Sequence, residues 1–155
     1  MLKKSSRIGW EDYFFEFAKL ASSRSTCLRR KVGAVLVKDK MVVSTGYNGP
    51  PRGLPHCSKT GCVRQDSNVP SGQRHELCRG LHAEQNAIIQ AAKNGVNVNG
   101  AYLYCSTKPC AICTKMIINA GITKVFYEQD YDDKFADKLA KQSDVEFIKV
   151  KSKKR

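Results

Sequence analysis

LHAEQNAIIQAAK at residues 81–93 and STKPCAIC at residues 106–113 decide the predicted fold of this chain. In the first stretch, apolar residues recur at helical spacing, which predicts a helix over 82–94 that ends before Gly95. In the second, a strand over 101–105 leads to Pro109, which suits the first turn of a helix over 109–120. Each stretch thus predicts a helix whose first turn carries histidine, glutamate or cysteine side chains.

The flanking sequence continues this alternation of helices and strands. The other predicted elements are a helix over 10–24, a hairpin of two strands that start at Val32 and Met41, a strand over 123–127, a helix over 132–142 and a strand over 145–150. Strands that alternate with helices predict an α/β protein, a three-layer α/β/α fold in which helices cover both faces of a mixed sheet of about five strands. In the first helix, apolar spacing predicts a buried face made of Trp10, Tyr13, Phe14, Phe17, Leu20 and Ala21.

Length and composition are those of one intracellular domain. Residues 1–155 are expected to form a single domain, with a cysteine-rich insertion over 50–80 and a basic tail over 149–155. No continuous apolar run has the length of a secretory signal or a membrane span, which predicts a cytoplasmic protein without membrane association. In that compartment, an odd count of seven cysteines favours metal ligation over disulfides, with zinc as the first candidate.

The net charge of +13 raises the question of a nucleic-acid partner. Five of the 27 basic residues lie in the tail over 149–155, which is interpreted as a solvated end. The excess that remains still favours an anionic substrate, such as a nucleotide.

His82, Cys110 and Cys113 are candidate ligands of a catalytic zinc ion. One imidazole and two thiolates make three ligands and leave a fourth tetrahedral position open for water. Cys110 and Cys113 are three residues apart in a first helical turn, so they share one face of that helix. The partial positive charge at a helix N-terminus stabilises thiolates at such positions.

Glu84 follows His82 by two residues and is a candidate proton shuttle rather than a ligand. His-x-Glu followed by Pro-Cys-x-x-Cys is the pattern of zinc nucleobase deaminases, in which the glutamate acts as general acid and base. Alone, Cys-x-x-Cys is typical of structural zinc sites and redox pairs, and a lone His-x-Glu carries little information. Both halves in this order, each at a helix start, favour the catalytic interpretation.

These motifs resemble those of the cytidine and deoxycytidylate deaminase superfamily, and most closely those of microbial deoxycytidylate (dCMP) deaminases. The resemblance covers residues 8–150 and rests on RSTC at 24–27, VGAVLV at 32–37, GYNGPPRG at 46–53, HAEQNAI at 82–88, TKPCAIC at 107–113 and AGITKVFY at 120–127. It implies a cytidine-deaminase-like fold and zinc-dependent hydrolysis of dCMP to dUMP and ammonia, which supplies precursors of dTTP. GYNG together with the insertion narrows the implied substrate to nucleoside monophosphates.

The resemblance also implies roles for residues around the base and the sugar. Asn48 is expected to bind the deoxyribose, and Tyr131 is expected to lie near the sugar or phosphate. Backbone groups near Ala83 and Thr107 are expected to contact the edge of the base.

The resemblance identifies the phosphate-binding residues and the regulation of this chain less directly than it identifies the residues around the base and the sugar. Arg52 and Lys93 are candidate phosphate-binding residues, and the alternative is that each is an ordinary surface charge. Family members commonly form hexamers that dCTP activates and dTTP inhibits. A homo-oligomer with these nucleotides as effectors is therefore expected.

The insertion raises the question of a second, structural zinc ion. Some members of the resembled family carry one, held by residues that match Cys27 and Cys57 and by a histidine of the insertion. A four-coordinate ion would use four of the five available residues, which are Cys27, Cys57, Cys62, His75 and Cys78. The alternative is that these cysteines are buried or idle thiols.

Other functions could use the same residues. A tRNA adenosine deaminase or other nucleic-acid deaminase shares the zinc ligands and would explain the basic tail, but GYNGPPRG and the cysteine-rich insertion argue against it. A non-catalytic nucleotide-binding protein or DNA-uptake accessory protein has no need for Glu84. Free cytidine is a third alternative substrate, which a phosphate requirement would exclude.

Overall fold

The computed structural model describes residues 7–151, which contain a five-stranded mixed sheet. In spatial order the strands are β2 (Met41–Tyr47), β1 (Gly33–Lys38), β3 (Tyr102–Thr107), β4 (Lys124–Gln129) and β5 (Glu146–Lys149). β1 runs antiparallel to both β2 and β3, whereas β3, β4 and β5 are parallel. β2 and the three parallel strands therefore end at the same edge of the sheet, where α/β proteins commonly bind ligands.

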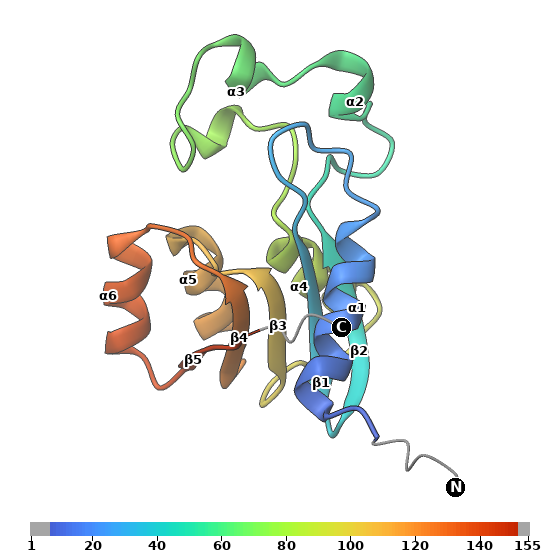
Figure 1. Ribbon diagram of the computed structural model, residues 1–155, viewed down its shortest axis with the longest axis vertical. Coiled ribbons are helices and arrows are strands. Elements are labelled where there is room, and N and C mark those ends of the chain that lie inside the picture. Colours follow the sequence, from blue (N-terminus) through green and yellow to red (C-terminus); the bar gives the residue numbers. More distant parts are fainter. Residues whose placement is uncertain (1–6, 152–155) are drawn as a thin grey trace, which may run out of the picture.

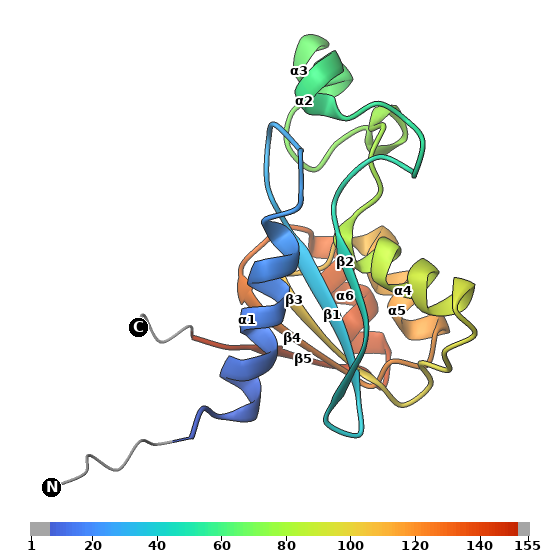
Figure 2. The same cartoon turned by 90° about the vertical axis from the view of Figure 1, so that its right-hand side faces the viewer.

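Helices cover both faces of this sheet, which confirms the predicted three-layer fold (Figures 1 and 2). α1 (Trp10–Ser22) lies on one face, whereas α4 (Ala83–Lys93) and α5 (Ala111–Asn119) lie on the other. α6 (Lys134–Gln142) packs against α5. Strand side chains alternate between the two layers: Ala34, Leu36, Leu103, Cys105 and Val125 face α4 and α5, and Val35, Val37, Tyr104 and Phe126 face α1.

The buried face of α1 differs from the predicted one, because it includes Phe15 and Ala18, which were not predicted. Phe14 and Phe15 are buried, whereas Trp10, Tyr13 and Leu20 are 45%, 39% and 69% exposed. The prediction was therefore wrong for these three residues. A helix that lies on a flat sheet touches it along one stripe, and the apolar arc of this sequence extends beyond that stripe.

α4 packs directly on β2 because Gly46 has no side chain. A Cβ atom at this position would lie 2.2 Å from the Ala83 carbonyl oxygen and 2.5 Å from the Ala87 nitrogen. Any other residue would push the helix away from the strand. Ser44 Oγ also donates a hydrogen bond to the Ala87 carbonyl oxygen at 2.7 Å, so the position of α4 on β2 is fixed.

The insertion over 50–80 lies above the edge of the sheet at which β2 ends (Figure 1). The chain leaves and returns side by side, because Gly49 and Leu81 exchange two backbone hydrogen bonds of 3.1 and 2.8 Å. Between them are three short helical elements: α2 (Cys57–Thr60), α3 (Val63–Asp66) and the 3₁₀ helix η1 (His75–Leu77). These elements are short, which agrees with the absence of regular periodicity in the sequence of this segment.

Residues 152–155 of the predicted basic tail lie outside the described residues, as do residues 1–6. Across residues 7–151, no helix combines the length and the apolar character that a membrane-spanning segment needs.

Candidate active site

The first turns of α4 and α5 meet at the edge of the sheet below the insertion. His82 is the N-cap residue of α4, and Cys110 is the N-cap residue of α5. Gln85 reaches back one turn, and its Oε1 accepts a hydrogen bond from the His82 backbone nitrogen at 2.8 Å. The histidine and the cysteines therefore stand at the positive ends of two helix dipoles, where thiolates are favoured.

The three predicted zinc ligands converge on one point. His82 Nδ1 lies 3.4 Å from Cys110 Sγ and 3.3 Å from Cys113 Sγ. Among residues 7–151, this is the one group of three or more histidine, cysteine or acidic side chains whose ligand atoms all lie within 4.8 Å of one another. Tetrahedral zinc places bound nitrogen and sulfur atoms roughly 3.5 Å apart. The three side chains therefore fit a zinc ion and leave its fourth position free for another ligand.

The two cysteines differ in acidity because each acts on the other. Hydrogen bonds from Cys113 and His82 lower the pKa of Cys110 to about 4, although burial opposes this. The same contact with Cys110, together with burial, raises the pKa of Cys113 well above its ordinary value. One thiolate therefore forms readily, whereas the second needs a cation beside it. This donor pair suits a thiophilic metal ion.

Glu84 lies in the first turn of α4 and is only 4% exposed. Burial raises the pKa of its carboxyl group, and the neighbouring His82 opposes this shift only in part. A carboxylate whose pKa is raised accepts a proton more readily than an exposed one. A proton carrier thus lies beside the metal-ligand cluster without being part of it.

His75, from the insertion, contacts the outer nitrogen of His82. His75 Nδ1 lies 3.1 Å from His82 Nε2, and His75 Nε2 lies 3.1 Å from the Gly72 carbonyl oxygen. Because a carbonyl oxygen can only accept, His75 carries its proton on Nε2, and its Nδ1 accepts the proton of His82 Nε2. A neutral His82 with its proton on Nε2 offers the lone pair of Nδ1 to a metal ion, which then takes the place of the hydrogen bond between Nδ1 and Cys110. The insertion therefore selects the tautomer that a metal ligand requires.

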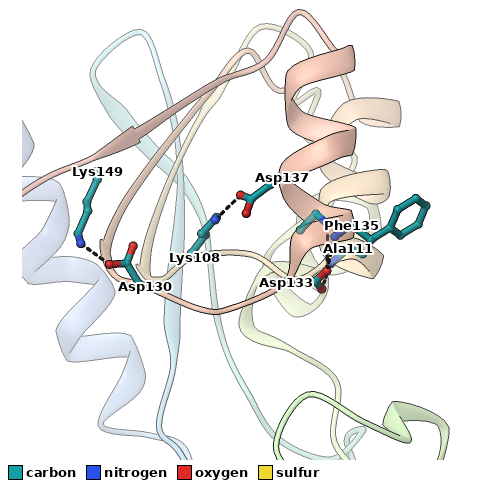
Figure 3. Close-up of polar contacts among 8 residues, drawn as sticks. Lys108, Ala111, Asp130, Asp133, Phe135, Asp137 and Lys149 are labelled. Atoms are coloured by element: carbon teal, nitrogen blue, oxygen red, sulfur yellow. Dashed lines mark hydrogen bonds and ion pairs between the residues drawn. The ribbon is translucent and has the colours of Figure 1, made fainter.

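Asp133 links α5 to α6 (Figure 3). Its Oδ1 accepts hydrogen bonds from the backbone nitrogens of Phe135 and Ala136 at 3.1 and 2.9 Å, and its Oδ2 accepts one from Ala111 at 2.9 Å. Burial raises the pKa of Asp133, but these hydrogen bonds outweigh it and lower the pKa. Since Ala111 directly follows Cys110, the carboxylate also holds the turn that carries this metal ligand. Sequence reasoning missed this link.

A cavity lies between the metal-ligand cluster and the insertion. Four residues predicted to contact the substrate line it, namely Asn48, Ala83, Thr107 and Tyr131. Thr107 Oγ1 is buried and, among the described residues, has no hydrogen-bond partner. Such a group is available to a bound molecule. The structure therefore brings these predicted residues together around one space.

Of the residues predicted to bind the sugar or the phosphate, Asn48 makes contacts within the protein, and Arg52 and Lys93 lie away from the cavity. The Asn48 side chain donates to the Arg30 carbonyl oxygen and accepts from the Val32 nitrogen, both at 2.8 Å, so it shapes the segment over 30–32. Arg52 and Lys93 are exposed and are not among the residues that line the cavity. Their contact with a phosphate stays a prediction.

The five candidate ligands of a second metal ion all line this cavity, but they divide into two groups. Burial and the neighbouring Cys27, Cys62 and Cys78 raise the pKa of Cys57, so these three thiols lie near Cys57. His75 is instead turned toward His82. In the described part of the chain, the four thiols do not reach the 4.8 Å separation seen around His82.

Two arginines that line the cavity were not among the predicted site residues. Arg64, in α3, is 8% exposed, and Arg30 lies over the Tyr131 ring, 5.5 Å from its centroid. Both come from segments without periodicity, so no pattern in the sequence distinguishes them from surface cations. Arg29 and Lys108 also line the cavity, which makes its wall strongly positive.

Comparison with known proteins agrees with this site. The family model of the cytidine and deoxycytidylate deaminase zinc-binding region matches residues 8–129. The deoxycytidylate deaminase of Schizosaccharomyces pombe is 44% identical over 126 residues, which cover 81% of this chain and 39% of that protein. ComE operon protein 2 of Bacillus subtilis is 41% identical over 140 residues, which cover 90% of this chain and 70% of that protein.

A solved structure extends the likeness to three dimensions. The dCMP deaminase from the cyanophage S-TIM5, in complex with dCMP and dUMP, superposes with a TM-score of 0.78 at 31% identity and covers 94% of this chain and 100% of that one. The chain spans well under half the length of the S. pombe relative. The matched segment nevertheless contains both zinc-ligand motifs, and the chain therefore belongs to the cytidine and deoxycytidylate deaminase family.

Proposed function

We propose that this protein hydrolyses dCMP to dUMP and ammonia. The observation that carries the proposal is the buried carboxyl group of Glu84 beside the cluster of His82, Cys110 and Cys113. Further support comes from the S-TIM5 enzyme, which binds dCMP and dUMP, and from the likeness to the S. pombe enzyme. In this reaction, the oxygen of water replaces the amino group at C4 of the base, and the amino group leaves as ammonia.

His82 Nδ1 and the sulfur atoms of Cys110 and Cys113 would hold the zinc ion. When bound there, zinc supplies a Lewis acid that lowers the pKa of a water molecule. The neighbouring residues keep these ligands in place. His75 and Gln85 prevent His82 from turning, because one binds its ring and the other its backbone.

Glu84 moves the protons of the reaction. As a carboxylate it takes a proton from the attacking water, and as a carboxylic acid it gives that proton to N3 of the cytosine ring. The same group then takes the remaining proton from the new hydroxyl group at C4 and gives it to the amine, which departs as ammonia and leaves a carbonyl at C4. Burial raises the pKa of Glu84, which makes its carboxylate a stronger base than that of an exposed glutamate.

The base is held by the cavity wall next to Glu84. Thr107 Oγ1 is buried and unpaired within residues 7–151, and it supplies a donor or acceptor for the edge of the base. Ala83 supplies backbone groups from the first turn of α4, and Tyr131, which also lines the cavity, contacts the sugar. Asn48 contacts the deoxyribose with the hydrogen-bonding capacity that its contacts to the segment over 30–32 leave free.

A second zinc ion, bound by Cys27, Cys57, Cys62 and Cys78, would fold the insertion into a fixed cover over the cavity. The proximity of Cys27, Cys62 and Cys78 to Cys57 and the contact of His75 with His82 support this choice among the five candidates. Cys₄ sites are common for structural zinc, and metal binding would draw the sulfur atoms together.

Assembly and regulation stay predictions from the family resemblance. These are a homo-oligomer, activation by dCTP, inhibition by dTTP and a cytoplasmic location.

Replacement of Glu84 by glutamine is expected to lower dCMP turnover by about 10²–10⁴-fold, because glutamine cannot carry protons. Ammonia release by the zinc-loaded protein measures this, with dCMP, deoxycytidine, dCTP and an adenosine-containing tRNA stem-loop assayed side by side. Equal zinc content of the variant serves as the control. Activity on the stem-loop alone, or undiminished turnover of dCMP by Glu84→Gln, would contradict the proposal.

Replacement of His75 by alanine is expected to weaken zinc binding at His82 by about 10- to 100-fold, because the imidazole loses the partner that fixes its tautomer. His75→Asn keeps an acceptor near the position of Nδ1 and should restore part of the affinity. Competition with a chromogenic chelator measures both variants. If His75 instead binds the second ion, His75→Ala will lose that ion and leave the affinity at His82 unchanged.

Replacement of Cys57 by serine is expected to remove one zinc ion per chain while the ion at His82 remains. Elemental analysis of protein purified with zinc measures the content. Cys105→Ala is a matched control, since Cys105 is a buried core thiol on β3. Unchanged zinc content in Cys57→Ser would exclude the second site.

A further inference from the structure

Arg64 is the most deeply buried of the cations that line the cavity. It is 8% exposed, whereas Arg29 and Arg30 are exposed. Lys108 is already paired with Asp137 (Figure 3). Arg64 therefore differs from the other three in holding a charge away from water without an acidic partner among the described residues.

The hydrogen bonds of Arg64 are incomplete within residues 7–151. Its Nη2 donates to the Pro70 carbonyl oxygen at 3.3 Å, whereas its buried Nε has no partner. A guanidinium group has five N–H donors in a planar fork, and burial of such a charge is unfavourable unless an anion or several acceptors satisfy it. The side chain is thus prepared for an anionic ligand.

The charge of Arg64 acts on side chains that line the cavity. After burial, Arg64 is among the charges that influence the pKa of His75, His82 and Tyr131. Tyr131 also reaches the insertion beside Arg64, since its hydroxyl group lies 2.9 Å from the position of a Cβ atom built on Gly72. Glu84 is the one acidic residue among the described residues that line this cavity.

We propose that Arg64 binds the 5′-phosphate of the substrate and makes the enzyme select nucleotides over nucleosides. This assignment rests on the proposed deamination of dCMP and adds the group that recognises its phosphate. A guanidinium fork matches two phosphate oxygens, and its buried position makes these charge-assisted hydrogen bonds stronger than those of an exposed cation. Arg30 lies across the Tyr131 ring from the same wall and contributes a second positive charge.

The test compares dCMP with deoxycytidine as substrates of wild-type protein, Arg64→Gln, Arg64→Lys and Lys59→Gln. Lys59 is an exposed cation of the same insertion and controls for loss of one charge. Arg64→Gln should lower kcat/KM for dCMP by roughly 10- to 100-fold, mainly through KM, and leave kcat/KM for deoxycytidine nearly unchanged. The kcat/KM of Arg64→Lys for dCMP should lie between the values of wild type and Arg64→Gln. The kcat/KM of Lys59→Gln should equal that of wild type.

A purely structural role of Arg64 would lower both activities equally, and that result would overturn the assignment. Loss of the preference for dCMP in Arg52→Gln or Lys93→Gln, but not in Arg64→Gln, would overturn it as well. If the wild-type protein deaminates neither compound, the proposed function fails, and calorimetric binding of dCMP still decides the role of Arg64. Equal binding of dCMP by wild type and Arg64→Gln would then contradict it.

Discussion

The geometry of the active site depends on the direct backbone contact between α4 and β2. Gly46 lets the helix approach so closely that a Cβ atom would overlap the Ala83 carbonyl oxygen at 2.2 Å. Because α4 lies against the strand in this way, its first turn reaches the edge of the sheet where β2 and β3 end. His82 and Glu84 occupy that turn, and the cysteines of α5 meet them there. One close contact thus determines where the chemistry can take place.

The insertion adds what the αβ core cannot supply. The core provides the proposed metal ligands and the proposed proton carrier, but it leaves them open at the edge of the sheet. The insertion covers this opening and contributes His75 to the outer nitrogen of His82 and Arg64 to the cavity wall. Four thiols, three of them from the insertion, would hold this cover in one conformation. On this view, metal affinity and substrate choice both depend on a segment that has little regular structure of its own.

Local patterns in the sequence predicted most of the fold and the centre of the site. Helical and strand periodicity located every long element within a few residues. The spacing of His82, Cys110 and Cys113 predicted that these side chains converge, because they belong to two helix starts. Contacts between distant segments were not predictable in this way. Asp133 bonds to Ala111 across 22 residues, and His75 turns away from the cysteines, because tertiary packing decides both. The burial of Arg64 could not be predicted, because no pattern in the sequence around it differs from that around a surface cation. The exposure of Trp10 could not be predicted either, because it depends on how much of α1 the sheet covers.

A crystal structure of zinc-loaded Glu84→Gln with dCMP tests the central claim most directly, because the substitution stops proton transfer and preserves the bound substrate. The prediction is a zinc ion between His82 Nδ1 and the sulfur atoms of Cys110 and Cys113. The cytosine ring should lie against residue 84, and the phosphate should lie on Arg64. An ion held by other residues, or a nucleotide bound away from this cavity, would contradict the account.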